Sequence, residues 1–189
     1  ALEVPGDQEL VYSLQVNTTH GVFNCIDPYQ FQEQAYNAVH FVDHLPENVY
    51  QQLGAQLIEV DMGLAEPISG VRFAVFAPNA SAVSVVGDFN WWNGARHAMQ
   101  KTDLGYWVVF IPGVEPGDKY KYQIKDAEGH ELPHKADPVG FYAQQYPSHA
   151  SEIFDHNEYQ WRDQVWQERD VGDLYLSLIH ISEPTRPIH

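Results

Sequence analysis

The sequence predicts an all-β protein, an immunoglobulin-like antiparallel β-sandwich preceded by a β-hairpin remnant and a short helical connector. Between Gly70 and Phe154, short apolar segments with a period of two are separated by Pro-Asn, Asn-Gly, Pro-Gly and Glu-Gly turn pairs. The same alternation occurs near the amino terminus, and apolar residues at helical spacing lie between the two regions. Short strands repeated at this interval are typical of two packed antiparallel sheets.

Residues 1–27 are predicted to be the carboxyl-terminal remnant of a preceding β domain. Apolar side chains alternate with polar ones at Leu10, Tyr12, Leu14 and Val16. The polar stretch "NTTHG" then leads into a second strand, "VFNCI", which is the signature of a β-hairpin. Because two strands alone are only marginally stable, we expect earlier strands of the same sheet to precede them.

Residues 28–65 are predicted to form a connector of one or two short helices. Pro46 suits a first helical turn, and Val49 and Leu53 recur at helical spacing. Gly54 suits the left-handed position that follows the end of a helix.

Residues 66–157 are predicted to form the β-sandwich. Its strands are read from the segments "VRFAVF", "AVSVVG", "YWVVFI", "KYKYQIK" and "SEIFD". Alternation in the fourth segment places one set of side chains on each face of the sheet. The apolar face would hold Tyr120, Tyr122 and Ile124, and the polar face Lys119, Lys121, Gln123 and Lys125.

The segment after the sandwich is predicted to leave the domain. In residues 158–175, Trp161 and Val165 share one side of a possible helix with Trp166, and these side chains would pack on another part of the protein. Residues 176–189, "LSLIHISEPTRPIH", differ from the rest of the chain and match the conceptual translation of a sequencing adapter. We therefore expect this tail to be an artefact and exclude it from fold reasoning.

The charge balance excludes two classes of partner. The chain has 10 Lys plus Arg against 26 Asp plus Glu, a formal net charge of −16. Nucleic acid and anionic membrane surfaces both require clustered cations, so we expect neither as a partner. A neutral ligand fits this composition better.

The cysteine content and the absence of targeting signals favour a cytoplasmic protein. Cys25 is the single cysteine, which excludes an internal disulfide framework and suits a reducing compartment. The sequence has no signal peptide and no apolar stretch long enough to cross a bilayer.

The sequence predicts no catalytic residues, no metal site and no cofactor within the chain. The order of the acidic residues shows no pair held across a cleft, which glycoside chemistry requires. His130 and His134 are four residues apart, but Pro133 argues against the helix that would align them as ligands. The chain also lacks a glycine-rich phosphate loop and a nucleophile elbow.

The segment "GDFNWWNG", residues 87–94, is the candidate binding site. Sugar rings present a C–H face that packs on indole, and their hydroxyl groups need amide or charged partners, such as Asn90, Asn93 and Lys121. If the preceding strand continued, Trp91 would point inward and Trp92 outward, because neighbouring side chains alternate. We therefore expect Trp92 to be the exposed ring, although burial of both tryptophans in the core is the alternative.

Several longer segments resemble one enzyme family. These are "CIDPYQF", "VYQQLGA", "GVRFAVFAPNASAVSVVGDFNWWNGARHAM", "GYWVVFIPGVEPGDKYKYQI" and "KADPVGFYAQQYPSHAS". Together they resemble the amino-terminal region of bacterial 1,4-alpha-glucan (glycogen) branching enzymes over roughly residues 10–170. In that family this region carries a carbohydrate-binding module of family 48, a small β-sandwich placed before a catalytic barrel.

The resemblance implies a role in glycogen biosynthesis. A branching enzyme cleaves an alpha-1,4 glucan and transfers the cut chain to a 6-hydroxyl group, through a covalent glycosyl-enzyme. The family's catalytic motifs, "DVVLNH", "GFRVDAV" and "SHDE", do not occur in this chain. The resemblance therefore implies a fragment whose residues 158–175 lead toward a missing barrel, and whose own part is glucan binding and interdomain packing.

The resemblance also implies two site residues. In glycogen-sensing modules of the family, glucose stacks on a tryptophan that matches Trp92 and contacts a lysine that matches Lys121. The second tryptophan of those modules has no counterpart in "KDAEGHEL". Two alternatives stay open: a non-enzymatic glycogen-binding adaptor, and the amino-terminal module of another family 13 glycoside hydrolase, either debranching or trehalose-forming.

Overall fold

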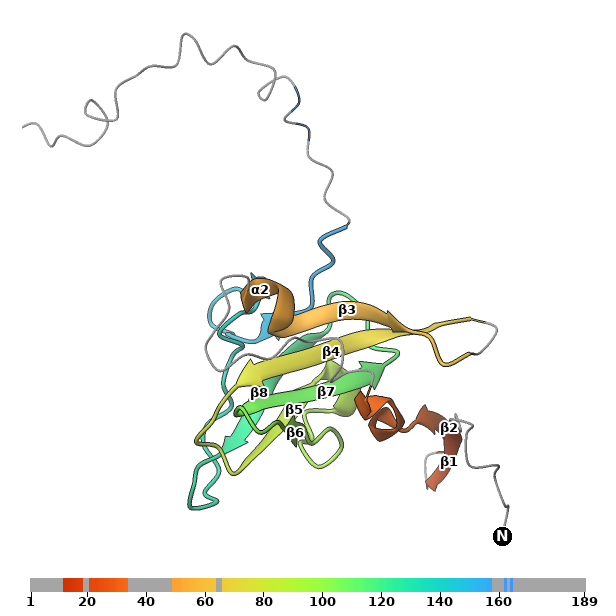
Figure 1. The fold of residues 1–189 in the computed structure, drawn as a ribbon, viewed down its shortest axis with the longest axis horizontal. Helices are drawn as coiled ribbons and strands as arrows, with labels where there is room; N and C mark the ends of the chain where they lie inside the picture. The colour runs from red at the N-terminus through yellow and green to blue at the C-terminus, as the bar shows by residue number, and fades with distance from the viewer. Residues whose placement is uncertain are drawn as a thin grey trace, which may run out of the picture. The chain divides into compact units, whose positions relative to one another are not determined.

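The structure is a computed structural model that describes residues 12–18, 21–33, 49–63, 66–157, 162 and 164 (Figure 1). The chain divides into two compact units, Ala1–Asp155 and His156–His189, and every element below belongs to the first. Apart from Arg162 and Gln164, the expected linker at 158–175 and the expected artefact at 176–189 lie outside the described residues. No helix in the described part is long and apolar enough to cross a membrane.

The predicted amino-terminal hairpin is confirmed. Strands β1 (Ser13–Thr18) and β2 (Gly21–Ile26) pair antiparallel, with Leu14 opposite Cys25. That this hairpin ends a preceding β domain stays a prediction.

The described part of the connector contains a 3-10 helix and a single turn of α-helix, and Gln32 and Glu33, which follow the 3-10 helix, are also helical. A 3-10 helix, η1, covers Pro28–Phe31, and the Asp27 side chain caps it by accepting a hydrogen bond from the Tyr29 amide at 2.9 Å. A single turn of α-helix, α2, covers Val49–Gln52. The rest of the expected helical stretch, residues 34–48, lies outside the described residues.

The expected helical connector is wrong at residues 54–60, which form strand β3 (Gly54–Val60). Gly54 adopts φ +82°, so it does occupy the left-handed position after a helix. The chain then turns directly into a strand, which pairs with residues 68–74. The missed signal is the apolar content of "LIEV", because β3 buries side chains on both faces and shows no clean alternation.

Two four-stranded antiparallel sheets form the sandwich, which confirms the predicted fold class. The first sheet has the order β3, β4 (Ile68–Phe76), β7 (Tyr106–Pro112) and β6 (Gln100–Lys101). The second has the order β5 (Ala82–Gly87), β8 (Lys119–Lys125), β10 (Ser151–Glu152) and β9 (Tyr142–Ala143). Figure 1 shows β3, β4 and β7 side by side in one layer.

The main core lies between the two sheets. Phe73 from β4 packs edge-on against Tyr120 from β8, with ring centroids 5.0 Å apart. Tyr120 and Tyr122 are buried, whereas Lys121 on the opposite face of β8 is half-buried, as the alternation predicted. The other buried members include Val71, Val75, Val83, Val85, Trp107, Val109, Ile111 and Ile153.

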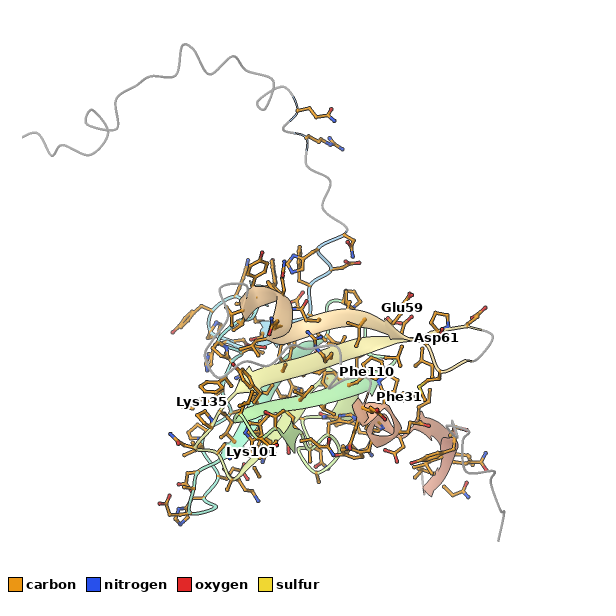
Figure 2. All side chains as sticks on the ribbon, in the orientation of Figure 1. Phe31, Glu59, Asp61, Lys101, Phe110 and Lys135 are labelled. Carbon is orange, nitrogen blue, oxygen red and sulfur yellow. The ribbon has the colours of Figure 1, made fainter. Side chains whose placement is uncertain are left out.

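A second apolar cluster covers the outer face of the β4–β7 pair. Phe31 of η1 is fully buried and packs edge-on against Phe110, with centroids 5.4 Å apart (Figure 2). Arg72 of β4 donates from Nη2 to the carbonyl oxygen of Gln52 at 3.1 Å, at the end of α2. Burial lowers the pKa of Arg72 to about 10, so it remains the cation that suits a helix carboxyl terminus.

A buried carboxylate ties the segment before β9 to the second sheet. The hydroxyl groups of Tyr120 and Tyr122 donate to Oδ2 of Asp137 at 2.7 and 2.9 Å. The Asp137 amide donates to Oγ of Ser151 at 2.9 Å, and the Val139 amide donates to Oδ1 of Asp137 at 2.8 Å. Burial raises the pKa of Asp137, while the hydrogen bonds that it accepts act in the opposite direction.

Candidate functional site

The loop that follows β5 carries both tryptophans on the surface. The strand ends at Gly87, and a 3-10 helix, η2 (Asp88–Asn90), interrupts the alternation from which the ring positions were predicted. Trp91 and Trp92 then adopt left-handed backbone conformations, with φ of 53° and 60°. Trp92 is 37% exposed, as expected, but Trp91 is 71% exposed, so its predicted inward position is wrong.

Asn90 lies beneath this loop. Its Oδ1 accepts from the Gly87 amide at 2.9 Å, and its Nδ2 donates to the Val85 carbonyl at 2.8 Å. Nδ2 also lies 2.9 Å from Nδ1 of His97. The side chain is 0% exposed, which corrects the expectation that Asn90 offers its amide to a sugar hydroxyl. Its position suits a role in holding the loop, since a buried amide needs all of these partners.

His97 completes the support of the loop from the other side. Burial, and then the neighbouring Arg96 charge, lower the pKa of His97 to about 4. A neutral imidazole can accept the Asn90 Nδ2 hydrogen bond at Nδ1, whereas an imidazolium cannot. The loop is also joined to the connector, because the Ala98 amide donates to Oη of Tyr29 at 2.9 Å.

The indole of Trp92 is anchored to strand β8 through Asp88. Nε1 of Trp92 donates to Oδ1 of Asp88 at 3.1 Å. The other carboxylate oxygen accepts from the Lys119 amide at 3.2 Å and lies 3.9 Å from Lys119 Nζ. The sequence did not predict a role for Asp88. The signal that could have indicated one is an acidic residue four positions before Trp92.

Lys121 lies on the outer face of the second sheet, as Lys119 does. It lies on β8 between Lys119 and Gln123, which point to the same side. Lys119 contacts the loop through Asp88, and Gly94 packs so closely on the end of the Gln123 side chain that a Cβ there would displace it. The loop therefore meets β8 on both sides of Lys121, and the structure brings Lys121 into the neighbourhood of Trp92.

Asn93 is exposed at the tip of the loop. Its Oδ1 accepts from the Ala95 amide at 3.0 Å, and its carbonyl accepts from the Arg96 amide at 3.3 Å. The Nδ2 group is the part of this side chain with donors for a ligand. Beside it, the Arg96 guanidinium stacks over Trp91 with Cζ 4.4 Å from the ring centroid, a contact that sequence reasoning missed.

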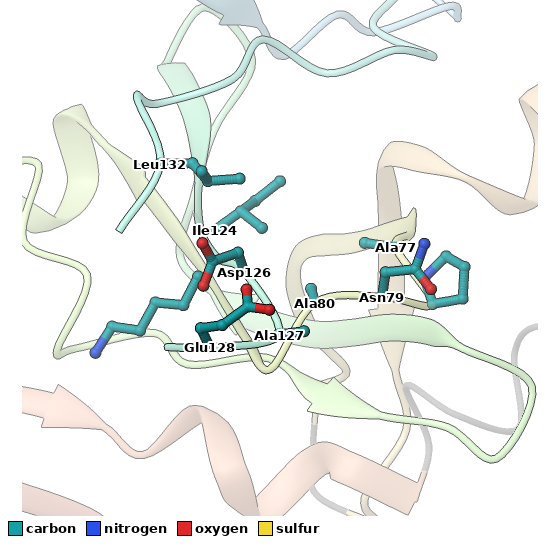
Figure 3. A pocket seen from close by; sticks show the side chains of 10 residues that line it. Ala77, Asn79, Ala80, Ile124, Asp126, Ala127, Glu128 and Leu132 are labelled. Carbon is teal, nitrogen blue, oxygen red and sulfur yellow. The ribbon is translucent and has the colours of Figure 1, made fainter. Parts of the chain in front are cut away.

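A shallow hollow lies at the opposite end of β8, away from the tryptophans. It has a volume of about 420 Å³ and is lined mostly by apolar atoms from the turn at residues 77–80 and from Ile124 and Leu132 (Figure 3). At its rim, ligand-type atoms of Asp126, Glu128 and His130 lie within 4.8 Å of one another. Glu128 and His130 are exposed, and His130 Nδ1 already contacts Asp126 at 3.3 Å. We therefore interpret this group as ordinary solvent-exposed side chains.

Comparison with known proteins gives two kinds of match. Residues 52–140 match the family model of carbohydrate-binding module 48, described as the isoamylase N-terminal domain. The chain is also 66% identical over 178 residues to the 1,4-alpha-glucan branching enzyme of Pseudoalteromonas atlantica, covering 94% of this chain and 24% of that protein.

Two further branching enzymes extend the comparison. Identity is 48% over 162 residues for Photobacterium profundum, covering 86% of this chain and 22% of the relative. For the branching enzyme of Vibrio parahaemolyticus, identity is 47% over 182 residues, covering 90% of this chain and 24% of the relative. A solved pullulanase from Bacillus acidopullulyticus has a TM-score of 0.46 at 19% identity over 77% of this chain and 15% of its own.

The chain thus spans about a quarter of the length of these three relatives. The matched region contains β3 to β8, the loop with both tryptophans, and Asp137. Residues 52–140 are therefore similar to family 48 of the carbohydrate-binding modules, within a chain that is similar to the amino-terminal part of 1,4-alpha-glucan branching enzymes.

Proposed function

We propose that the β-sandwich binds an alpha-glucan, such as glycogen or a maltooligosaccharide, on the outer face of its second sheet. The observation that carries this proposal is the exposed Trp92 ring, held by Asp88 next to Lys119 and Lys121 in a domain similar to family 48 modules. Trp92 supplies the face on which a sugar ring stacks. Lys121 and the Nδ2 group of Asn93 supply donors for hydroxyl groups.

The anchoring of Trp92 favours ligand binding because it reduces the entropy lost when the ring is immobilised. The hydrogen bond to Asp88 fixes the indole before a sugar arrives, and Asn90 fixes the backbone below it. Preorganised rings bind with less ordering cost than mobile ones. A neutral ligand also meets no repulsion from the net charge of −16.

For the whole protein we propose 1,4-alpha-glucan branching activity in glycogen biosynthesis, in the cytoplasm. Support comes from relatives of that name at 66%, 48% and 47% identity, which favour it over an adaptor or another family 13 hydrolase. The reaction would cleave an alpha-1,4 bond and join the cut chain to a 6-hydroxyl group. The present residues would contribute glucan contact and interdomain packing, and the proposal places no catalytic residue, metal or cofactor among them.

A glycogen-containing native gel tests the binding proposal. We expect glycogen to retard the 189-residue chain, and Trp92→Ala to weaken that retardation several-fold while the near-UV spectrum of the remaining aromatic residues is kept. Phe76→Leu, at an exposed aromatic residue of the other sheet, is the control and should leave retardation unchanged. Retardation that is equal in wild type and Trp92→Ala would remove Trp92 from the site.

A further inference from the structure

The outer face of the second sheet carries a second exposed ring across the strands from Trp92. The register pairs Lys119 of β8 with Glu152 of β10, and Glu152 with Tyr142 of β9. Directly opposite residues in antiparallel strands point to the same face. Lys119, Glu152 and Tyr142 therefore form one row, and the Asp88 carboxylate joins Trp92 to its first member.

The inner side of the same strands confirms this orientation. Ser151, the neighbour of Glu152, is opposite Tyr120 and is buried with it in the core. Glu152 must then point outward, because neighbouring side chains on a strand alternate. Tyr142 is 50% exposed and stacks on Phe154, with centroids 6.0 Å apart and planes 11° from parallel.

We propose that this row extends the glucan site, with Tyr142 as a second sugar-stacking residue at its far end. The inference rests on the proposed glucan binding at Trp92. Strands β8 and β9 are separated by β10, so Lys119 and Tyr142 are about 10 Å apart at the usual spacing between strands. A single sugar ring at Trp92 cannot reach Tyr142, whereas a longer chain can contact both ends.

The residues between the two rings favour a carbohydrate over a protein partner. Lys119 offers donors and Glu152 offers acceptors, and both are half-buried on the sheet. Sugar hydroxyl groups can use both kinds of partner while the C–H faces of the rings stack at either end. An apolar protein surface would instead desolvate these charged groups without offering them hydrogen bonds, which is costly.

Tyr142 can take the role of the second tryptophan that the glycogen-sensing modules have and this chain lacks. The hairpin at residues 125–132 carries no aromatic residue, and its exposed side chains are mainly charged or polar. Tyr142 provides an aromatic face on a different strand, and its stacking on Phe154 orients the ring before a ligand binds. The predicted consequence is a preference for longer glucans.

Calorimetric titration of the 189-residue chain with maltotriose and maltoheptaose tests this inference. We expect Tyr142→Ala to weaken maltoheptaose binding about 3- to 10-fold and to leave maltotriose binding unchanged. Trp92→Ala should weaken both. Tyr142→Phe, which keeps the aromatic face, should bind like wild type. Tyr50→Ala is the matched control, since Tyr50 is 53% exposed but lies on α2 beside β3 of the other sheet.

The outcomes separate this inference from the proposed function. Unchanged maltoheptaose binding by Tyr142→Ala, with weakened binding by Trp92→Ala, would overturn the role of Tyr142 and leave the Trp92 site standing. Equal losses in Tyr142→Ala and Tyr50→Ala would also overturn it. A wild-type chain that binds neither sugar would overturn both proposals. If Tyr142→Ala lowers the melting temperature, Tyr142→Leu keeps the packing on Phe154, removes the aromatic face, and is expected to show the same selective loss.

Discussion

Asn90 shows how a polar residue can shape a surface that it never reaches. Its side chain holds the end of β5 by accepting a hydrogen bond from the Gly87 amide and donating one to the Val85 carbonyl. The backbone can then turn through the left-handed conformations of Trp91 and Trp92, which are costly for residues with a Cβ. The exposure of both rings therefore depends on a buried amide.

Substitution of Asn90 by Ala should lower the free energy of unfolding by about 2–3 kcal/mol, because buried donors and acceptors lose their partners. Asn93→Ala is the matched control. Its side chain is exposed and accepts one hydrogen bond from the Ala95 amide, so its loss should cost about 1 kcal/mol or less. Urea denaturation followed by circular dichroism measures both. Equal stability of the two variants would show that the Asn90 contacts do not hold the loop.

The arrangement of the candidate site was predictable in part. The types Trp92, Lys121 and Asn93 indicated sugar contact, and the structure places all three at the loop and the adjoining face of β8. The positions of Asn90 and Trp91 were not predictable from alternation, because alternation holds only while a strand continues, and here η2 ends it. The proposed role of Tyr142 had no signal in the sequence either, because its row includes Lys119 of β8, which is distant in sequence.

Among the elements, β8 presents different side chains on its two faces. The outer face presents Lys119 and Lys121, while the inner face sends the hydroxyl groups of Tyr120 and Tyr122 to one oxygen of Asp137. Burial raises the pKa values of both tyrosines, so both remain protonated donors at neutral pH. The segment before β9 is thereby fixed to β8.

Tyr122→Phe should lower the free energy of unfolding by about 1–3 kcal/mol, because the buried Asp137 carboxyl loses one of its donors. Tyr50→Phe is the control, since its exposed hydroxyl makes one long contact within the described residues, at 3.3 Å from Gln51 Nε2, and should change stability by less than about 0.5 kcal/mol. Thermal unfolding of both variants would measure the difference. A Tyr122→Phe variant as stable as Tyr50→Phe would argue that Asp137 is satisfied without this bond.

Element-scale prediction succeeded for the longer strands β4, β5, β7 and β8 and failed for β3, β6 and β9. The alternation in β8 correctly separated Tyr120 and Tyr122 from the lysines. Strand β3 was missed because it follows α2 directly at Gly54 and its burial shows no clean period of two. The two-residue strands β6 and β9 are too short to show any period, and long-range pairing alone defines them.

At the scale of the whole molecule, a net charge of −16 and a neutral ligand predict how the glycogen affinity responds to salt. A neutral glucan releases no counterions when it binds, so glycogen affinity should change by less than about twofold between about 50 and 500 mM NaCl. Affinity electrophoresis over this range measures the effect, with heparin as a polyanionic comparison that should not bind. A steep loss of glycogen affinity with salt would point to charge pairing as the main source of binding.

The contacts of Tyr29 and Phe31 affect the choice of domain boundaries for expression. The family match covers residues 52–140, yet Tyr29 and Phe31 before it contact Ala98 and Phe110 within it. Beyond its other end, β9 and β10 complete the second sheet, and Ile153 is part of the core. A clone trimmed to the family boundaries would expose the Phe110 ring and an unpaired edge of β8, and would be prone to aggregate. Boundaries near residues 27 and 155 keep these contacts, so the unit suited to crystallisation is wider than the unit recognised by sequence.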